Sequence, residues 1–172
     1  MRPRSLLRAC LVLGLLGCQP PSSEETIEAD ARDDALVVEV RVDEDDASLL
    51  TEFDVRDAPA GEYLTFASDA RPTDVAAAMA LDVDACLRDG GRCEVPGVGR
   101  FAGRTTVTAG GPSSLSAAST WGPARTAYFT LVRRGGDAGV PFRAKVTVTL
   151  EVNRGCGNPG PPDVRAVDPA AG

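Results

Sequence analysis

Apolar and polar residues alternate along several segments of the chain. The alternation is clearest over residues 142–152 and recurs over residues 36–43. A period of two predicts strands with one buried and one solvent-facing side. In the longer segment, the apolar positions are Phe142, Ala144, Val146, Val148, Leu150 and Val152, and the polar positions are Arg143, Lys145, Thr147, Thr149 and Glu151.

Shorter segments between these two complete the predicted fold. Each is bounded by Gly-rich or Pro-containing turns, and only residues 73–79 have a helical composition, with Thr73 or Asp74 as the N-cap. Many short strands with little helix predict an all-β fold, a single antiparallel β-sandwich of about seven to eight strands. The additional predicted strands are residues 49–55, 62–68, 79–86, 101–108 and 125–133.

The two ends of the chain have a different composition. Residues 18–35 are rich in acidic residues, Ser and Pro, which predicts a disordered tether, about 55–60 Å long when fully extended. Residues 154–172 form a Gly/Pro-rich segment that is also predicted to be disordered. The sandwich domain is therefore predicted to occupy residues 36–153.

Residues 1–17 have the composition of a secretory signal peptide. Arg2, Arg4 and Arg8 form a positive start, and an apolar run from residue 9 ends in the small residue Gly17. This run is too short for a transmembrane helix, which needs about 20 apolar residues.

The end of this segment, Leu15-Leu16-Gly17-Cys18, resembles the lipobox of bacterial lipoproteins. The resemblance covers residues 1–18 only. It implies that the chain is cut after Gly17 and that acyl chains, such as palmitate, are attached to Cys18, and two or more such chains anchor a protein stably. Gln19 directly follows this cysteine, and it resembles the residue found at that position in lipoproteins that are sorted to the outer membrane. The alternative is a secreted protein in which Cys18 lies near the cleavage site by chance.

The charge of the chain narrows the choice of partners. Loss of the three signal-peptide arginines would change the formal net charge from −7 to −10. Such an acidic protein is not expected to bind nucleic acid, or anionic lipid through charge alone. The predicted link to the membrane is the lipid on Cys18.

Three cysteines remain after Cys10 and Cys18 are set aside. Cys86 and Cys93 flank an Asp-Gly-Gly turn, which favours a local disulfide between them. The alternative is that both are free, or that one is paired with Cys156. A zinc site is disfavoured because the spacing is unsuitable and the chain has no histidine.

The absence of histidine also excludes Ser–His–Asp and Cys–His catalysis. Lys145 lies on the polar side of a predicted strand, where a buried catalytic base is not expected. The acidic residues 43–46 fit a solvated turn. An EF-hand calcium loop is rejected because Ala47 stands at its fifth position and Ser48 replaces the glycine of its sixth. A looser calcium site that adds Asp82 or Asp84 is an alternative. We predict no catalytic residue, metal ligand or cofactor.

Aromatic residues offer one candidate ligand site. Trp121 and Tyr128, together with Tyr63 and Phe101, could form a platform for a sugar, although a structural tryptophan is the commoner case. The sequence thus favours a non-catalytic binding module of the cell envelope that presents loops to a protein or glycan. The alternatives are a structural or assembly accessory of the outer membrane and, ranked lowest, a carboxylate-based hydrolase.

Overall fold

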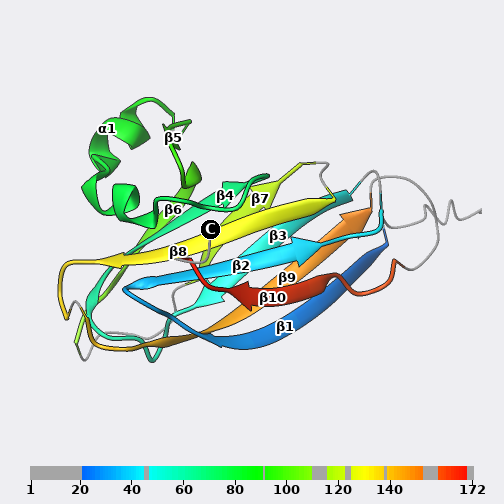
Figure 1. Cartoon of the computed structure of the whole chain (residues 1–172), viewed down its shortest axis with the longest axis horizontal. Helices are drawn as coiled ribbons and strands as arrows, with labels where there is room; N and C mark the ends of the chain where they lie inside the picture. Colours follow the sequence, from blue (N-terminus) through cyan, green and yellow to red (C-terminus); the bar gives the residue numbers. More distant parts are fainter. Residues whose placement is uncertain are drawn as a thin grey trace, which may run out of the picture.

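The computed structural model describes residues 21–44, 47–90, 92–109, 116–122, 125–137, 139–152 and 159–169. These residues form the predicted antiparallel β-sandwich, with ten strands in two sheets (Figure 1). The four-stranded sheet has the order β1 (Ser22–Asp30), β9 (Arg143–Val152), β3 (Ala47–Asp54) and β7 (Ser116–Trp121). The six-stranded sheet has the order β10 (Asp163–Val167), β2 (Ala35–Arg41), β8 (Thr126–Arg134), β4 (Gly61–Ser68), β6 (Gly99–Val107) and β5 (Glu94–Val95).

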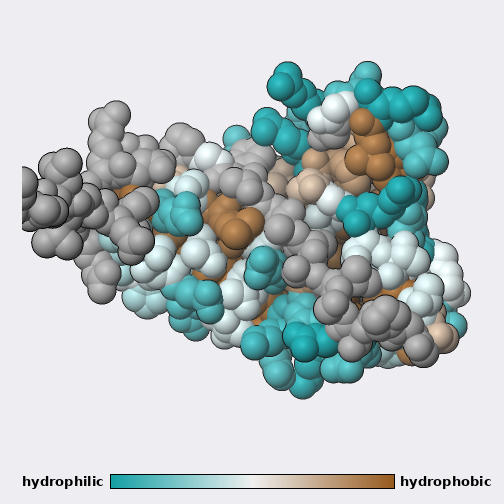
Figure 2. Space-filling view, turned by 180° about the vertical axis from the view of Figure 1, so that it is seen from behind, coloured by the Kyte–Doolittle hydropathy of each residue, from teal (hydrophilic) through white to brown (hydrophobic). Residues whose placement is uncertain are grey.

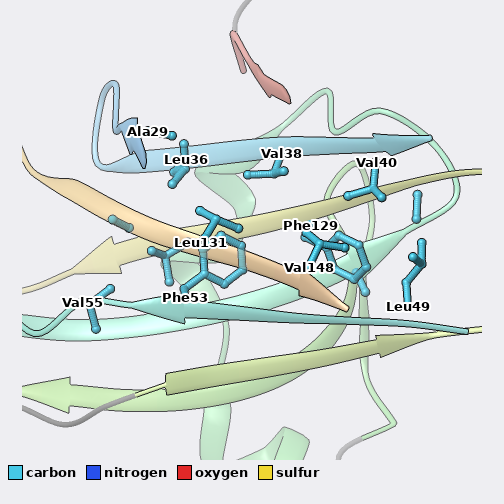
Figure 3. Close-up of a cluster of buried hydrophobic side chains, with 14 of the residues drawn as sticks. Ala29, Leu36, Val38, Val40, Leu49, Phe53, Val55, Phe129, Leu131 and Val148 are labelled. Carbon is cyan, nitrogen blue, oxygen red and sulfur yellow. The ribbon is translucent and has the colours of Figure 1, made fainter. Parts of the chain in front are cut away.

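The main core lies between the two sheets. The alternation predicted for residues 142–152 is confirmed, since Val146 and Val148 of β9 are fully buried and Lys145 is exposed. Figure 3 shows Val148 pointing into the same cluster as Phe53 of β3 and Leu131 of β8. β9 is one of the two inner strands of the four-stranded sheet, with β1 and β3 as its neighbours, and its apolar side faces the core between the sheets.

β2 is buried on both sides, although the sequence predicted only one buried side. Leu36, Val38 and Val40 face the main core as predicted, but Val37 and Glu39 on the opposite side are also buried. The reason is the position of β2 inside the six-stranded sheet, where β10 and β8 flank it. Glu39 is covered by Arg165 of β10.

The chain between β4 and β6 covers the outer face of the six-stranded sheet. It forms η1 (Val75–Ala80), α1 (Val83–Arg88) and β5, which pack a second core against Leu64, Phe66 and Val132. Figure 2 shows this insertion as a projecting lobe covered largely by hydrophilic side chains.

Of the two elements predicted between β4 and β5, the helix is confirmed and the strand is not. The expected helix over residues 73–79 corresponds to η1, and the Asp74 side chain caps it by accepting from the Ala77 N–H. The strand predicted over residues 79–86 is wrong, because part of that segment belongs to α1. The Asp82 carboxylate accepts from the Ala85 N–H at 2.9 Å, which satisfies a backbone donor at the helix start.

Cys86 and Cys93 form the predicted disulfide, with their Cα atoms 5.4 Å apart. The turn between them is present, and Gly90 has a φ of 74°, which glycine adopts without strain. The chain before the turn is helical rather than extended, because Cys86 belongs to α1. The remaining cysteine, Cys156, lies outside the described residues.

The ordered sandwich extends beyond the predicted limits of 36 and 153. β1 pairs with β9 over its whole length and β10 pairs with β2, so the prediction of disorder is wrong for residues 22–30 and 163–167. Both are edge strands with a single neighbour, and they bury few side chains, such as Ile27 and Val164 in part. An edge strand can therefore keep a polar composition typical of a disordered segment.

Candidate functional site

The strand registers define two ends of the sandwich. Ser22 of β1 lies opposite Glu151 of β9, and we call this the proximal end. At the opposite end, Asp30 of β1 lies beside Arg143 of β9. This end, which we call the distal end, carries the turn over residues 31–34 and the loops over residues 55–60 and 135–142 (left in Figure 1).

A buried cation lies beneath the distal loops. Arg133, near the end of β8, is only 1% exposed. Its Nε donates to Asp34 Oδ1 at 2.9 Å, and its Nη2 donates to Asp34 and, at 2.6 Å, to the Val140 carbonyl. Its guanidinium also lies 5.0 Å from the centre of the Phe142 ring, a cation–π contact. Arg133 therefore joins the turn over residues 31–34 to the loop over residues 135–142.

Tyr63 connects the loop over residues 55–60 to the same network. Its ring is fully buried and meets Phe142 edge-on, with centroids 5.4 Å apart. Its hydroxyl donates to the Pro59 carbonyl at 2.7 Å. Burial raises the pKa of Tyr63 above its ordinary value, although the neighbouring Arg133 lowers it in part. A phenol is protonated at neutral pH even at its ordinary pKa, so the Tyr63 hydroxyl keeps the hydrogen bond to loop 55–60.

The turn over residues 31–34 is a tight two-residue turn closed by an isolated antiparallel bridge between Arg32 and Ala35. Asp33 and Asp34 have φ values of 49° and 63°, and the flanking Arg32 and Ala35 exchange two backbone hydrogen bonds. Such a two-residue turn needs positive φ, which aspartate tolerates better than most residues. The Asp34 carboxylate also accepts from the Gly139 N–H at 3.1 Å. The turn and loop 135–142 are thereby held in a fixed relation.

The surface above this network is mixed in character. Val140 is 49% exposed and is one of two large apolar side chains exposed in the described part of the chain. The turn and loops of this end also carry exposed charged side chains of both signs. The exposed charged residues of the turn and loops are Arg32, Asp33, Arg56, Asp57 and Asp137.

A charged hollow of about 270 Å³ opens beside these loops, on the outer face of the four-stranded sheet. Arg56 pairs with Asp54 at its rim, and this contact lowers the pKa of Asp54. Arg143 donates to Asp30 at 2.7 Å, which lowers the pKa of Asp30. The residues that line the charged hollow are Glu28, Asp54, Arg56, Asp57, Arg143 and Lys145.

Of the two predicted platform residues, Tyr128 contacts a buried carboxylate. It lies on β8 in the six-stranded sheet and hydrogen-bonds to the buried carboxylate of Glu39. Burial opposes ionisation of Glu39, but hydrogen bonds from Arg165, Arg41 and Tyr128 outweigh it and lower the pKa. This cluster holds β10 against β2.

Trp121, the other predicted platform residue, belongs to the opposite sheet. It lies at the end of β7 and pairs with Leu49 of β3. Its side chain lies outside the described part of the structure. The two residues thus come from strands of different sheets.

The candidate calcium site does not assemble among the described residues. Asp82 caps α1, and Asp84 lies 3.3 Å from Arg104. Within the described ranges no group of three or more acidic or cysteine side chains is arranged to hold a metal ion, and Asp45 and Asp46 lie outside them. The predicted lipidation site, Cys18, also lies outside the described residues.

Comparisons with known proteins provide no further assignment. No protein-family model matches the chain, and no curated protein or solved structure does so. Within the described residues, no helix has the length and apolar character needed to cross a bilayer. The function must therefore be inferred from the geometry of the chain itself.

Proposed function

We propose that this protein is a lipid-anchored binding module of the cell envelope, with a place at the outer membrane. Lipid on Cys18 attaches it to the membrane, and its distal end binds a protein or glycan. The observation that carries the proposal is the network around Arg133, which links one turn and two loops that lie far apart in sequence.

This network favours binding because it fixes the loops before a partner arrives. Ordering a loop during association costs conformational entropy, and loops that are already held avoid much of this cost. Binding residues are often found on loops that a rigid sandwich positions. The distal end offers a partner one exposed apolar side chain, Val140, and exposed charges of both signs on the same turn and loops.

The charged hollow supports a binding role more than a catalytic one. A carboxylic acid that protonates a leaving group near neutral pH needs a raised pKa. The pKa of Asp54 is instead lowered by Arg56. The paired charges of the hollow are suited to recognising a polar or charged group on a ligand.

Affinity capture from envelope extracts with three forms of the mature chain would test this proposal. The distal variant carries Arg56→Ser, Asp57→Ser and Val140→Ser. The control variant carries Leu87→Ser, Arg88→Ser and Asp89→Ser in the helical insertion, which removes the same kinds of exposed side chain. We expect the distal variant to lose captured partner by about tenfold or more, since loss of a central contact commonly costs over 1 kcal/mol.

The control variant should capture the partner as well as the parent does. Equal capture by the distal variant and the parent would contradict the assignment of the distal end. Both variants should show the circular dichroism spectrum and melting temperature of the parent, so that a loss of capture is not a loss of folding.

A further inference from the structure

The start of β1 lies close to the predicted anchor. β1 begins at Ser22, four residues after Cys18, and the Pro21 carbonyl already accepts from the Val152 N–H at 3.1 Å. Four residues span at most about 14 Å when fully extended. The ordered structure thus leaves only a short connection in place of the long tether expected from composition.

We infer that the sandwich stands on the membrane by its proximal end, with the distal loops pointing away from the lipid surface. This inference rests on the proposed function, because it takes the lipid to be on Cys18. A connection of this length keeps Ser22 near the lipid headgroups. The distal end is the opposite end of β1, so it is the part of the domain held farthest from the anchor.

Charge disfavours an arrangement in which the sandwich lies flat on its four-stranded sheet. The outer face of β1, β9 and β3 carries more acidic than basic side chains, and anionic lipid headgroups repel such a face within about one Debye length, ~10 Å. The acidic residues on this face are Glu24, Glu28, Asp30, Glu52, Asp54 and Glu151, and the basic residues are Arg143 and Lys145.

The same geometry limits the class of partner. β9 has ten residues, and a strand rises about 3.4 Å per residue, so the sandwich is roughly 34 Å long. Together with the connection, the distal loops lie no more than about 50 Å from the membrane surface. A partner that binds the distal loops must therefore present its contact surface within that distance of the membrane.

Energy transfer to the lipid surface can test the orientation. The lipidated protein carrying Cys156→Ser would be reconstituted in vesicles of phosphatidylethanolamine and phosphatidylglycerol with an acceptor dye on the headgroups. A donor dye would be attached through Asp163→Cys at the proximal end or Asp57→Cys at the distal end, both exposed positions. We expect transfer to be severalfold stronger from the proximal dye.

Equal transfer from the two positions, or stronger transfer from the distal one, would overturn the inference. A second variant inserts a Gly/Ser segment of about 15 residues after Gln19, which should weaken the proximal transfer by freeing the domain from the surface. Unchanged energy transfer from the proximal dye in this variant would also overturn the inferred orientation. A failure of the lipid anchor would be recognised separately, since the protein would then not float with the vesicles.

Discussion

Replacing Arg133 by alanine is expected to lower the free energy of unfolding by about 3–5 kcal/mol, as is typical when one partner of a buried ion pair is removed. Arg133 is 1% exposed, and its partner Asp34 has a side chain that is only 18% exposed. The substitution removes the guanidinium that pairs with the Asp34 carboxylate, which keeps only its hydrogen bond from the Gly139 N–H, and it removes the side-chain donor to the Val140 carbonyl. It also opens space beside Gly61, which packs against the Arg133 side chain. Chemical denaturation monitored by circular dichroism measures this loss.

Two further variants separate the charge from the packing. Arg133→Met keeps most of the side-chain volume, and it should cost less than Arg133→Ala because the cavity is smaller. The exposed Arg56→Ala, with an ion pair at the surface, should change stability little. If Arg133→Ala unfolds at the same denaturant concentration as the parent, the network does not hold the distal loops.

Replacing Val148 by aspartate is expected to unfold the domain. Val148 is fully buried between the two sheets, and an unpaired charge there costs several kcal/mol against a total stability of about 5–15 kcal/mol. Thermal melting followed by circular dichroism would show the loss of the folded baseline. The matched control is Thr149→Asp, one residue along β9 on the outer face, which should change stability by about 1 kcal/mol or less.

A Val148→Asp protein that melts like the parent would show that the side of β9 assigned to the core is wrong. The neighbouring Val146→Asp substitution, at a second fully buried position on the same side of the strand, should behave in the same way.

The sequence predicted the parts of the fold that depend on local pattern. β9 was predicted correctly because one side contacts the core and the other meets solvent, so its alternation is regular. The Cys86–Cys93 disulfide was predicted because a short turn alone brings the two residues together. β1 and β10 were missed because their stability comes from hydrogen bonds to β9 and β2, and their own composition does not reveal this.

The distal end was harder to predict from sequence. Arg133 lies on the same side of β8 as Phe129 and Leu131 and is buried with them, although a charged side chain is ordinarily expected at the surface. Its partner Asp34 is 99 positions away in the chain, and no local pattern relates the two. Asp33 and Asp34 fall within the segment predicted to be a disordered tether, and the signal that could have identified the turn is that aspartate tolerates positive φ.

Mass spectrometry of the mature N-terminus is the most direct test of the proposed lipid anchor. We expect a chain that begins at Cys18 and carries the added mass of at least two acyl chains. The Cys18→Ser variant should carry no lipid and should keep residues 1–17, because the thiol is the attachment point that a lipobox provides. A mature chain that begins at another residue, with an unmodified cysteine, would contradict the anchor and the membrane orientation that depends on it.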